Sequence, residues 1–167
     1  MKHTISILVE NKFGVLARVA GLFSARGYNI DSLTVSETQD KTISRMTVVV
    51  NAEDEKTLEQ IKKQLNKLID IITIVDYTKK EYIERELVFI KIAADKNTLP
   101  FIKKVVDKAA KSSSASGLAC ARFLEKKSDS VIVELVDDQE RIKNFLSELK
   151  DLKVIEVVRS GRIAIAK

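Results

Sequence analysis

The chain has 167 residues, of which 45% are hydrophobic and 32% are charged, a balance typical of a soluble globular protein with a substantial core. With no tryptophan, one proline and five glycines, it lacks the composition of a disordered protein, and no apolar run reaches the roughly 18 residues of a membrane span. The net charge of +5 comes entirely from residues 79–167, which hold 19 basic and 14 acidic side chains, whereas residues 1–78 hold ten of each.

The N-terminus and the cysteine content indicate the compartment. Residues 1–10 ("MKHTISILVE") alternate as a strand does and lack the continuous apolar block of a signal peptide. The single cysteine, Cys120, permits no internal disulfide. We therefore expect a cytoplasmic protein.

The first half of the chain predicts the element order βαββαβ. Periodicity and punctuation place, in chain order, a strand at 3–10, a helix at 14–26, strands at 29–38 and 42–51, a helix capped by Asp54, and a strand at 70–78. The helix at 14–26 carries a stripe of apolar residues on one face, and Gly27 is suited to end it.

The second half repeats that order. It predicts a strand at 85–94, a helix beginning at Thr98 and Pro100, a small-residue loop at 112–117, a hairpin at 118–136 turning at 126–129, a helix capped by Asp137 or Asp138, and a last strand with a short tail strand at 153–167. The predicted fold class is therefore α+β, with two ferredoxin-like βαββαβ domains at 1–78 and 79–167.

The residues for most enzyme chemistry are missing. The only histidine is His3, so neither a zinc site of the usual kind nor a Ser-His-Asp triad is expected. Nucleotide-binding glycine motifs are also absent, and no catalytic site is expected in this chain. RNA-binding domains of this shape stack bases on aromatic side chains of central strands, but residues 42–50 and 130–136 contain none.

The corner before the first helix has the groups that a free amino acid needs. A helix N-terminus offers unpaired N–H groups to a carboxylate, and the Asn11 side-chain carbonyl can accept from an ammonium group. Gly14 would let a ligand approach the backbone, and Val15 and Leu16 could contact an aliphatic side chain.

Asn29 lies at the other end of that helix, roughly 20 Å away at about 1.5 Å per residue. If Asn11 and Asn29 serve one ligand, two chains must pack with these helices antiparallel, giving two equivalent sites about a two-fold axis. In the alternative interpretation, Asn11 and Asn29 are turn residues, and Gly14 and Gly27 are helix caps.

Residues 5–35 ("ISILVENKFGVLARVAGLFSARGYNIDSLTV") and 44–50 ("SRMTVVV") resemble the N-terminal ACT domain of the acetolactate (acetohydroxyacid) synthase small subunit. Residues 83–92 ("IERELVFIKI") and 154–167 ("VIEVVRSGRIAIAK") resemble the start and end of the C-terminal domain of that family. Residues 93–123 depart from the family pattern, although their expected secondary structure fits.

The resemblance implies a regulatory subunit that activates a catalytic large subunit and confers feedback inhibition by valine. It implies thiamine diphosphate, FAD and magnesium in that partner and no cofactor in this chain. The effector-binding residues that it implies are Asn11, Gly14, Val15 and Leu16 of one ACT domain with Asn29 and Ile30 of another.

Two other functions share this fold. A tandem-ACT transcriptional regulator would sense an amino acid without an enzyme partner. An acylphosphatase-type hydrolase would need an arginine in the loop after the first strand, where residues 10–14 ("ENKFG") offer none. In the second half, Lys104, Lys108 and Lys111 share one helix face, which is either solvated or docks onto an acidic partner.

Overall fold

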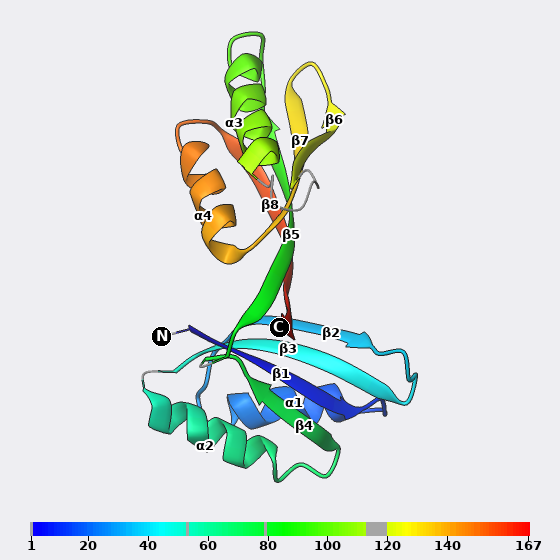
Figure 1. Cartoon of the computed structure of the whole chain (residues 1–167). Coiled ribbons are helices and arrows are strands. Elements are labelled where there is room, and N and C mark those ends of the chain that lie inside the picture. The colour runs from blue at the N-terminus through cyan, green and yellow to red at the C-terminus, as the bar shows by residue number, and fades with distance from the viewer. Residues whose placement is uncertain (1, 53, 79, 113–119) are drawn as a thin grey trace. The chain divides into compact units, whose positions relative to one another are not determined.

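The structure, a computed structural model, describes residues 2–52, 54–78, 80–112 and 120–167 (Figure 1). The chain divides into two compact units, one formed by Met1–Ile83 with Gly161–Lys167 and the other by Glu84–Ser160. Across the described ranges, no helix is long and apolar enough to cross a membrane.

The first unit has a four-stranded sheet with two helices on one of its faces (Figure 1). Its elements are β1 (Lys2–Glu10), α1 (Val15–Ser24), β2 (Ile30–Glu37), β3 (Ile43–Asn51), α2 (Glu55–Leu65) and β4 (Ile71–Asp76). The strand order is β2-β3-β1-β4, and β1 pairs antiparallel with both of its neighbours. The predicted βαββαβ order is confirmed.

Alternation along the strands separates the two faces of this sheet. Ile5, Ile7 and Val9 of β1 point to the helix-covered face and are at most 1% exposed. α1 adds Phe23, which is fully buried in the same core. Because the burial of one such side chain contributes about 1.5–3 kcal/mol, this apolar alternation fixes which face of each strand receives the helices.

The opposite face of the first sheet receives the C-terminal end of the chain. Leu33 packs into the core, so its neighbours Ser32 and Thr34 point to the other face. There the Thr34 hydroxyl donates to the carbonyl oxygen of Arg162 at 2.6 Å, and the Arg162 N–H donates to Ser32 Oγ at 3.2 Å. The hydroxyl of the buried Tyr77 lies 3.5 Å from the carbonyl oxygen of Ala164.

The second unit is built in the same way, with α3 and α4 on one face of its sheet (Figure 1). Its elements are β5 (Tyr82–Ala93), α3 (Leu99–Ser112), β6 (Ala121–Lys126), β7 (Ser130–Asp137), α4 (Gln139–Glu148) and β8 (Val154–Ala166). The strand order is β6-β7-β5-β8. The strands expected from the sequence to be central, at 42–50 and 130–136, carry no aromatic side chain. The structure adds β5 as a central strand, and β5 does carry an aromatic residue, Phe89, which is 36% exposed.

Two helix starts follow the capping residues that the sequence predicts. The Asp54 carboxylate accepts from the Thr57 N–H at 2.7 Å, and this hydrogen bond holds the pKa of Asp54 below its usual value. The Asp138 carboxylate accepts from the Arg141 N–H at 2.9 Å, which settles the choice between Asp137 and Asp138.

The end of the chain differs from the expectation. Instead of a last strand followed by a separate tail strand, β8 is one strand, and its end from Gly161 onward belongs to the first unit. The expected division at 78/79 lies near the division after Ile83. The small-residue loop and the start of the hairpin fall largely on residues 113–119, which lie outside the described residues.

We predict that Gly161→Ala loosens the C-terminal segment. Gly161 has a φ of +81°, and a Cβ there would lie 2.8 Å from Thr34 Cγ2 and 2.9 Å from Ser32 Oγ. We expect the variant to lower the free energy of unfolding by about 1–3 kcal/mol, measured by denaturant titration.

Gly27→Ala is the matched control for that variant. Gly27 also has a positive φ, +69°, but a Cβ there would meet nothing within 4 Å. It should therefore show backbone strain alone, about 1 kcal/mol. Equal losses in the two variants would show that the contact of Gly161 with β2 contributes nothing.

Candidate functional site

The start of α1 presents unpaired backbone donors. Gly14 precedes the helix in a left-handed conformation, with φ +81° and ψ −5°, and no side chain caps this end. Its carbonyl oxygen accepts the first helical hydrogen bond, from the Arg18 N–H at 3.0 Å. Among the described residues, nothing accepts from the N–H groups of Leu16 and Ala17. These two donors lie at the positive end of the helix dipole, where an anion is stabilised.

An arginine lies beside the same helix start. The Arg18 Nε donates to Asp70 Oδ2 at 2.8 Å, and the Asp70 side chain is only 9% exposed. Arg18 Nη1 lies 3.2 Å from the position that a Cβ of residue 14 would take. A nearly buried carboxylate therefore holds a half-exposed guanidinium next to Gly14, and the same corner offers both N–H donors and a positive charge.

Asn11 is fixed at this corner by the loop between β2 and β3. Its backbone N–H donates to the carbonyl oxygen of Thr42 at 2.7 Å, and its side-chain nitrogen donates to the carbonyl oxygen of Lys41 at 2.9 Å. The side-chain nitrogen is thus engaged, whereas Oδ1 has no hydrogen-bond partner among the described residues. The side-chain carbonyl remains available to accept from an ammonium group, as the sequence predicts.

The two apolar residues after Gly14 point in different directions. Leu16 is 45% exposed, so an aliphatic ligand could contact it. Val15 is 2% exposed and packs into the core of the first unit. The expectation that both side chains contact a ligand therefore needs correction, because helical spacing turns Val15 inward with Val19 and leaves Leu16 outside.

Asn29 and Ile30 lie at the other end of α1. The Asn29 side-chain nitrogen donates to Asp31 Oδ1 at 2.8 Å. The hydrogen bond from Lys2 contributes most to holding the pKa of Asp31 below its usual value, and the bond from Asn29 adds to it. Ile30 is half-buried against the core. The ten residues of α1 span about 15 Å, so one chain does not bring Asn29 to Gly14.

The candidate residues do not line either of two grooves on the first unit. A groove of about 520 Å³ lies between α2 and β4 and includes Lys62 and Asp76. A second groove, of about 700 Å³, lies over β2 and β3 and includes Arg45 and Ile163. In a single chain the candidate residues therefore lie at the two ends of α1, outside both grooves.

Sequence reasoning did not identify Arg18 or Asp70 as part of this corner. Arg18 follows Gly14 by one helical turn, a spacing that could have indicated it. Asp70 is 52 positions from Arg18, and nothing in a single sequence shows that they pair. Elsewhere, His3 Nδ1 lies 3.0 Å from the Thr78 hydroxyl, and Cys120 is buried. Among the described residues, histidine, cysteine and acidic side chains form no cluster of three or more that could hold a metal.

Two family models match the chain. The model described as AHAS small subunit-like ACT domain matches residues 5–73, and the model described as small subunit of acetolactate synthase matches residues 85–167. Together they span most of the chain, in the same order as the two βαββαβ patterns.

Named relatives agree along the whole length. The probable acetolactate synthase small subunit of Archaeoglobus fulgidus is 40% identical over 167 residues, which cover 100% of this chain and 98% of the relative. The acetolactate synthase small subunit of Mycolicibacterium smegmatis is 41% identical over 165 residues, which cover 99% and 91%.

A solved structure supports the same conclusion. The crystal structure of the acetolactate synthase small subunit from Thermotoga maritima superposes with a TM-score of 0.83 at 30% identity, covering 100% of this chain and 98% of that one. The chain therefore belongs to the acetolactate synthase small-subunit family, and its N-terminal part contains the ACT domain of that family.

Proposed function

We propose that this chain is the regulatory subunit of acetolactate synthase in branched-chain amino acid biosynthesis, that it activates the catalytic large subunit, and that it confers feedback inhibition by valine. The observation that carries the proposal is the corner at Gly14, where unpaired N–H groups, a guanidinium and a free amide carbonyl come together. Family membership along the whole chain supports it.

On this proposal, catalysis belongs entirely to the partner. Thiamine diphosphate, FAD and magnesium are bound by the large subunit, and this chain contributes neither a cofactor nor a catalytic residue. Both subunits are expected in the cytoplasm.

Each feature of a bound valine has a matching group at the corner. The carboxylate meets the N–H groups of Leu16 and Ala17 and the guanidinium of Arg18. The ammonium donates to Oδ1 of Asn11, whose nitrogen is already engaged. The isopropyl group packs on Leu16, which is half-exposed. The absence of a side chain at Gly14 leaves room for the ligand against the backbone.

A second copy of the chain closes the site. If two α1 helices pack antiparallel, the Gly14 corner of one copy meets Asn29 and Ile30 of the other, and a two-fold axis makes two such sites. The exposed side of α1 suits this packing, because Ala17, Gly21 and Ser24 are small and let two helices approach closely.

Regulation then follows from differential affinity. Valine favours the arrangement of two chains that closes the site, and inhibition results if the large subunit is most active with another arrangement. A typical coupling free energy of about 1–3 kcal/mol would change affinity by roughly 5–150-fold, enough for feedback control.

The test is a calorimetric titration of the purified chain with L-valine, with D-valine and L-lysine as controls. Saturable binding of L-valine alone, at one site per chain and two per dimer, would support both the effector and the two-chain site. Saturable binding of L-lysine with equal affinity would contradict an aliphatic effector site.

We predict that Gly14→Asp abolishes the response to valine while the chain stays folded. The new carboxylate would lie beside Arg18 Nη1, take the place of the ligand carboxylate and repel it. Like-charge contacts cost several kcal/mol, so we expect affinity to fall by about 100-fold or more, measured by the same titration.

Gly14→Ala separates charge from backbone strain. It imposes the same positive φ on a residue with a Cβ but adds no carboxylate, and the Cβ would lie 3.2 Å from the end of the Arg18 side chain. Its loss of affinity should be about tenfold or less. If the alanine variant binds as poorly as the aspartate variant, the ligand carboxylate is not held at this corner.

We predict that Asn29→His weakens valine binding by about tenfold while the dimer persists, because one polar contact from the second copy is lost. Asn66→His is the control, since Asn66 is an exposed asparagine that follows α2. Both would be titrated with valine and sized by light scattering. An unchanged valine affinity in the Asn29 variant would show that the second copy contributes no contact through Asn29.

A further inference from the structure

Two large apolar side chains of the first unit are almost completely exposed. Phe13 is 103% exposed and Ile69 is 95% exposed, whereas the other exposed large apolar side chains among the described residues are at most 62% exposed. A single exposed leucine or isoleucine is ordinary on a protein surface. Two large apolar side chains that are almost fully exposed on neighbouring loops instead indicate a surface that is covered in an assembly.

The loops that carry them are held together. Phe13 lies between β1 and α1, and Ile69 lies between α2 and β4. The Glu10 N–H donates to the carbonyl oxygen of Asp70 at 2.9 Å, and the Asp70 carboxylate accepts from Arg18. A backbone hydrogen bond and an ion pair thus hold Asp70, next to Ile69, against the end of β1 and the first turn of α1 on either side of Phe13, so a partner would meet an ordered surface.

Once internal ion pairs are counted, the charges around these two side chains leave a small positive excess. Glu10 pairs with Lys12 at 2.7 Å, and Asp70 pairs with Arg18 at 2.8 Å. Lys41 and Lys67, on the adjoining loops, form no ion pair among the described residues, and against them stands Asp40, whose carboxylate accepts from Thr42. A complementary surface would therefore have an apolar recess bordered by carboxylates.

We propose that Phe13 and Ile69 are the anchors by which this chain docks into an apolar, acid-rimmed recess of the catalytic large subunit. The proposal rests on the function proposed above, which requires such a partner. Large side chains that enter a recess and leave water are the residues that carry most binding energy at interfaces, and two such anchors on rigid loops make an effective contact.

A second copy of the chain is the alternative occupant. The side of α1 suited to self-association exposes the small residues Ala17, Gly21 and Ser24, whereas Phe13 lies before the helix. If Phe13 instead entered a groove elsewhere on a second copy, a two-fold axis would repeat that contact within one dimer, and Phe13→Ser would then weaken the homodimer.

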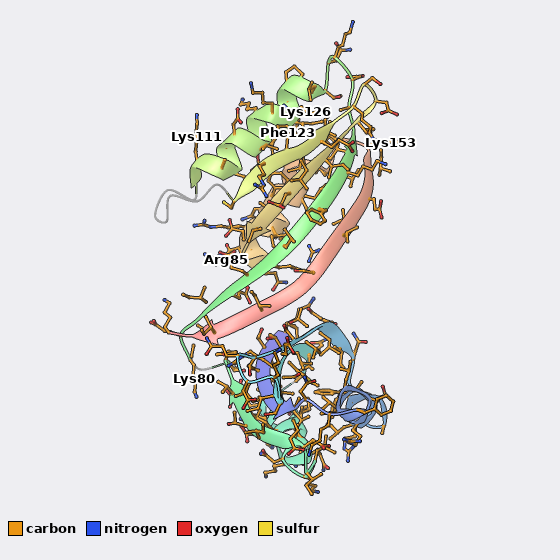
Figure 2. The ribbon with its side chains drawn as sticks, turned by 90° about the vertical axis from the view of Figure 1, so that its right-hand side faces the viewer. Lys80, Arg85, Lys111, Phe123, Lys126 and Lys153 are labelled. Carbon is orange, nitrogen blue, oxygen red and sulfur yellow. The ribbon has the colours of Figure 1, made fainter. Side chains whose placement is uncertain are left out.

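The second unit offers a weaker candidate surface. Its labelled basic side chains Arg85, Lys111, Lys126 and Lys153 lie at separate places around the unit (Figure 2). Lys126 is engaged over the ring of Phe123, with Nζ 4.2 Å from the ring centroid. On the helix face predicted from the sequence, Lys108 pairs with Glu148 at 2.8 Å. The basic side chains of the second unit are therefore dispersed and partly paired, whereas the two most exposed large apolar side chains lie on neighbouring loops of the first unit.

This placement links regulation to docking through one short loop. Residues 11–14 carry Asn11 and Gly14, which face the effector, and Phe13, which faces the partner. A ligand that binds the first two residues acts directly on the position of the third. The effector therefore changes the partner contact without a pathway through the core.

The test compares Phe13→Ser and Ile69→Ser with Phe101→Ser and Ile165→Ser, which remove exposed side chains of the same types at other surfaces. The full-length chain would be titrated into its cognate large subunit, and both direct binding and the concentration for half-maximal activation would be measured. Thermal unfolding and the affinity for valine would be measured on each chain alone.

We expect each anchor variant to weaken binding to the large subunit by about tenfold or more, and the double variant by more than either. The control variants should stay within about twofold. Unfolding and dimer mass of the anchor variants should be unchanged, because the side chains of Phe13 and Ile69 are already almost fully exposed.

The other outcomes overturn the proposal in different ways. If the wild-type chain binds the large subunit and both anchor variants bind equally well, the docking surface lies elsewhere. If the anchor variants lose the homodimer but keep the large subunit, a second copy covers these residues. If Phe101→Ser alone weakens binding, the second unit carries the contact. If the wild-type chain does not bind the large subunit, the proposed function itself fails.

Discussion

The antiparallel pairing of β1 with β3 is the constraint on which the candidate site depends. β1 is central in its sheet, and its register places Glu10, the last residue of the strand, opposite Ile43. A slip of one residue would turn Ile5, Ile7 and Val9 away from the helices and forfeit about 1.5–3 kcal/mol for each. The end of β1 is therefore held in place, and so is the point from which the loop into α1 begins.

That fixed point explains why the site we propose needs two copies of the chain. The corner at Gly14 supplies contacts that are each worth about 1 kcal/mol when exposed to water. Association costs at least several kcal/mol, so one open corner is a poor binding site for so small a ligand. A second copy that covers the corner excludes water, strengthens the same contacts and adds the asparagine from the far end of α1. The length of α1 thus makes dimerisation a condition of sensing in the function we propose.

The sequence predicts the fold well because the fold is determined locally. Period-2 and period-3.6 patterns, and caps such as Asp54 and Asp138, are each readable within about ten residues. Other contacts join positions far apart in the chain, such as the ion pair of Arg18 with Asp70 and the close packing of Gly161 on β2. They depend on register and on how elements stack, which a single sequence does not record.

The same limit applies inside the candidate site. Helical spacing alone indicates that Val15 and Val19 share a face, so the inward direction of Val15 could have been predicted. The exposure of Phe13 could not, because a phenylalanine between a strand and a helix usually packs inward. Only the structure shows that the ring of Phe13 is 103% exposed, whereas Phe23 is fully buried in the core of the same unit.

If one loop faces both valine and the large subunit, the coupling between the two must be reciprocal. If bound valine lowers the affinity of the chain for the large subunit by a certain factor, the bound large subunit lowers the affinity for valine by the same factor. A glycine at position 14 is well suited to such a loop, because glycine has no Cβ penalty at a positive φ, here +81°, and adopts negative φ about as readily. The ion pair of Arg18 with Asp70 keeps the carboxylate-binding group in place while the loop responds. In the function we propose, the chain would thereby join a positioned binding group to an adjustable backbone, and a modest change at the ligand would alter the partner surface directly.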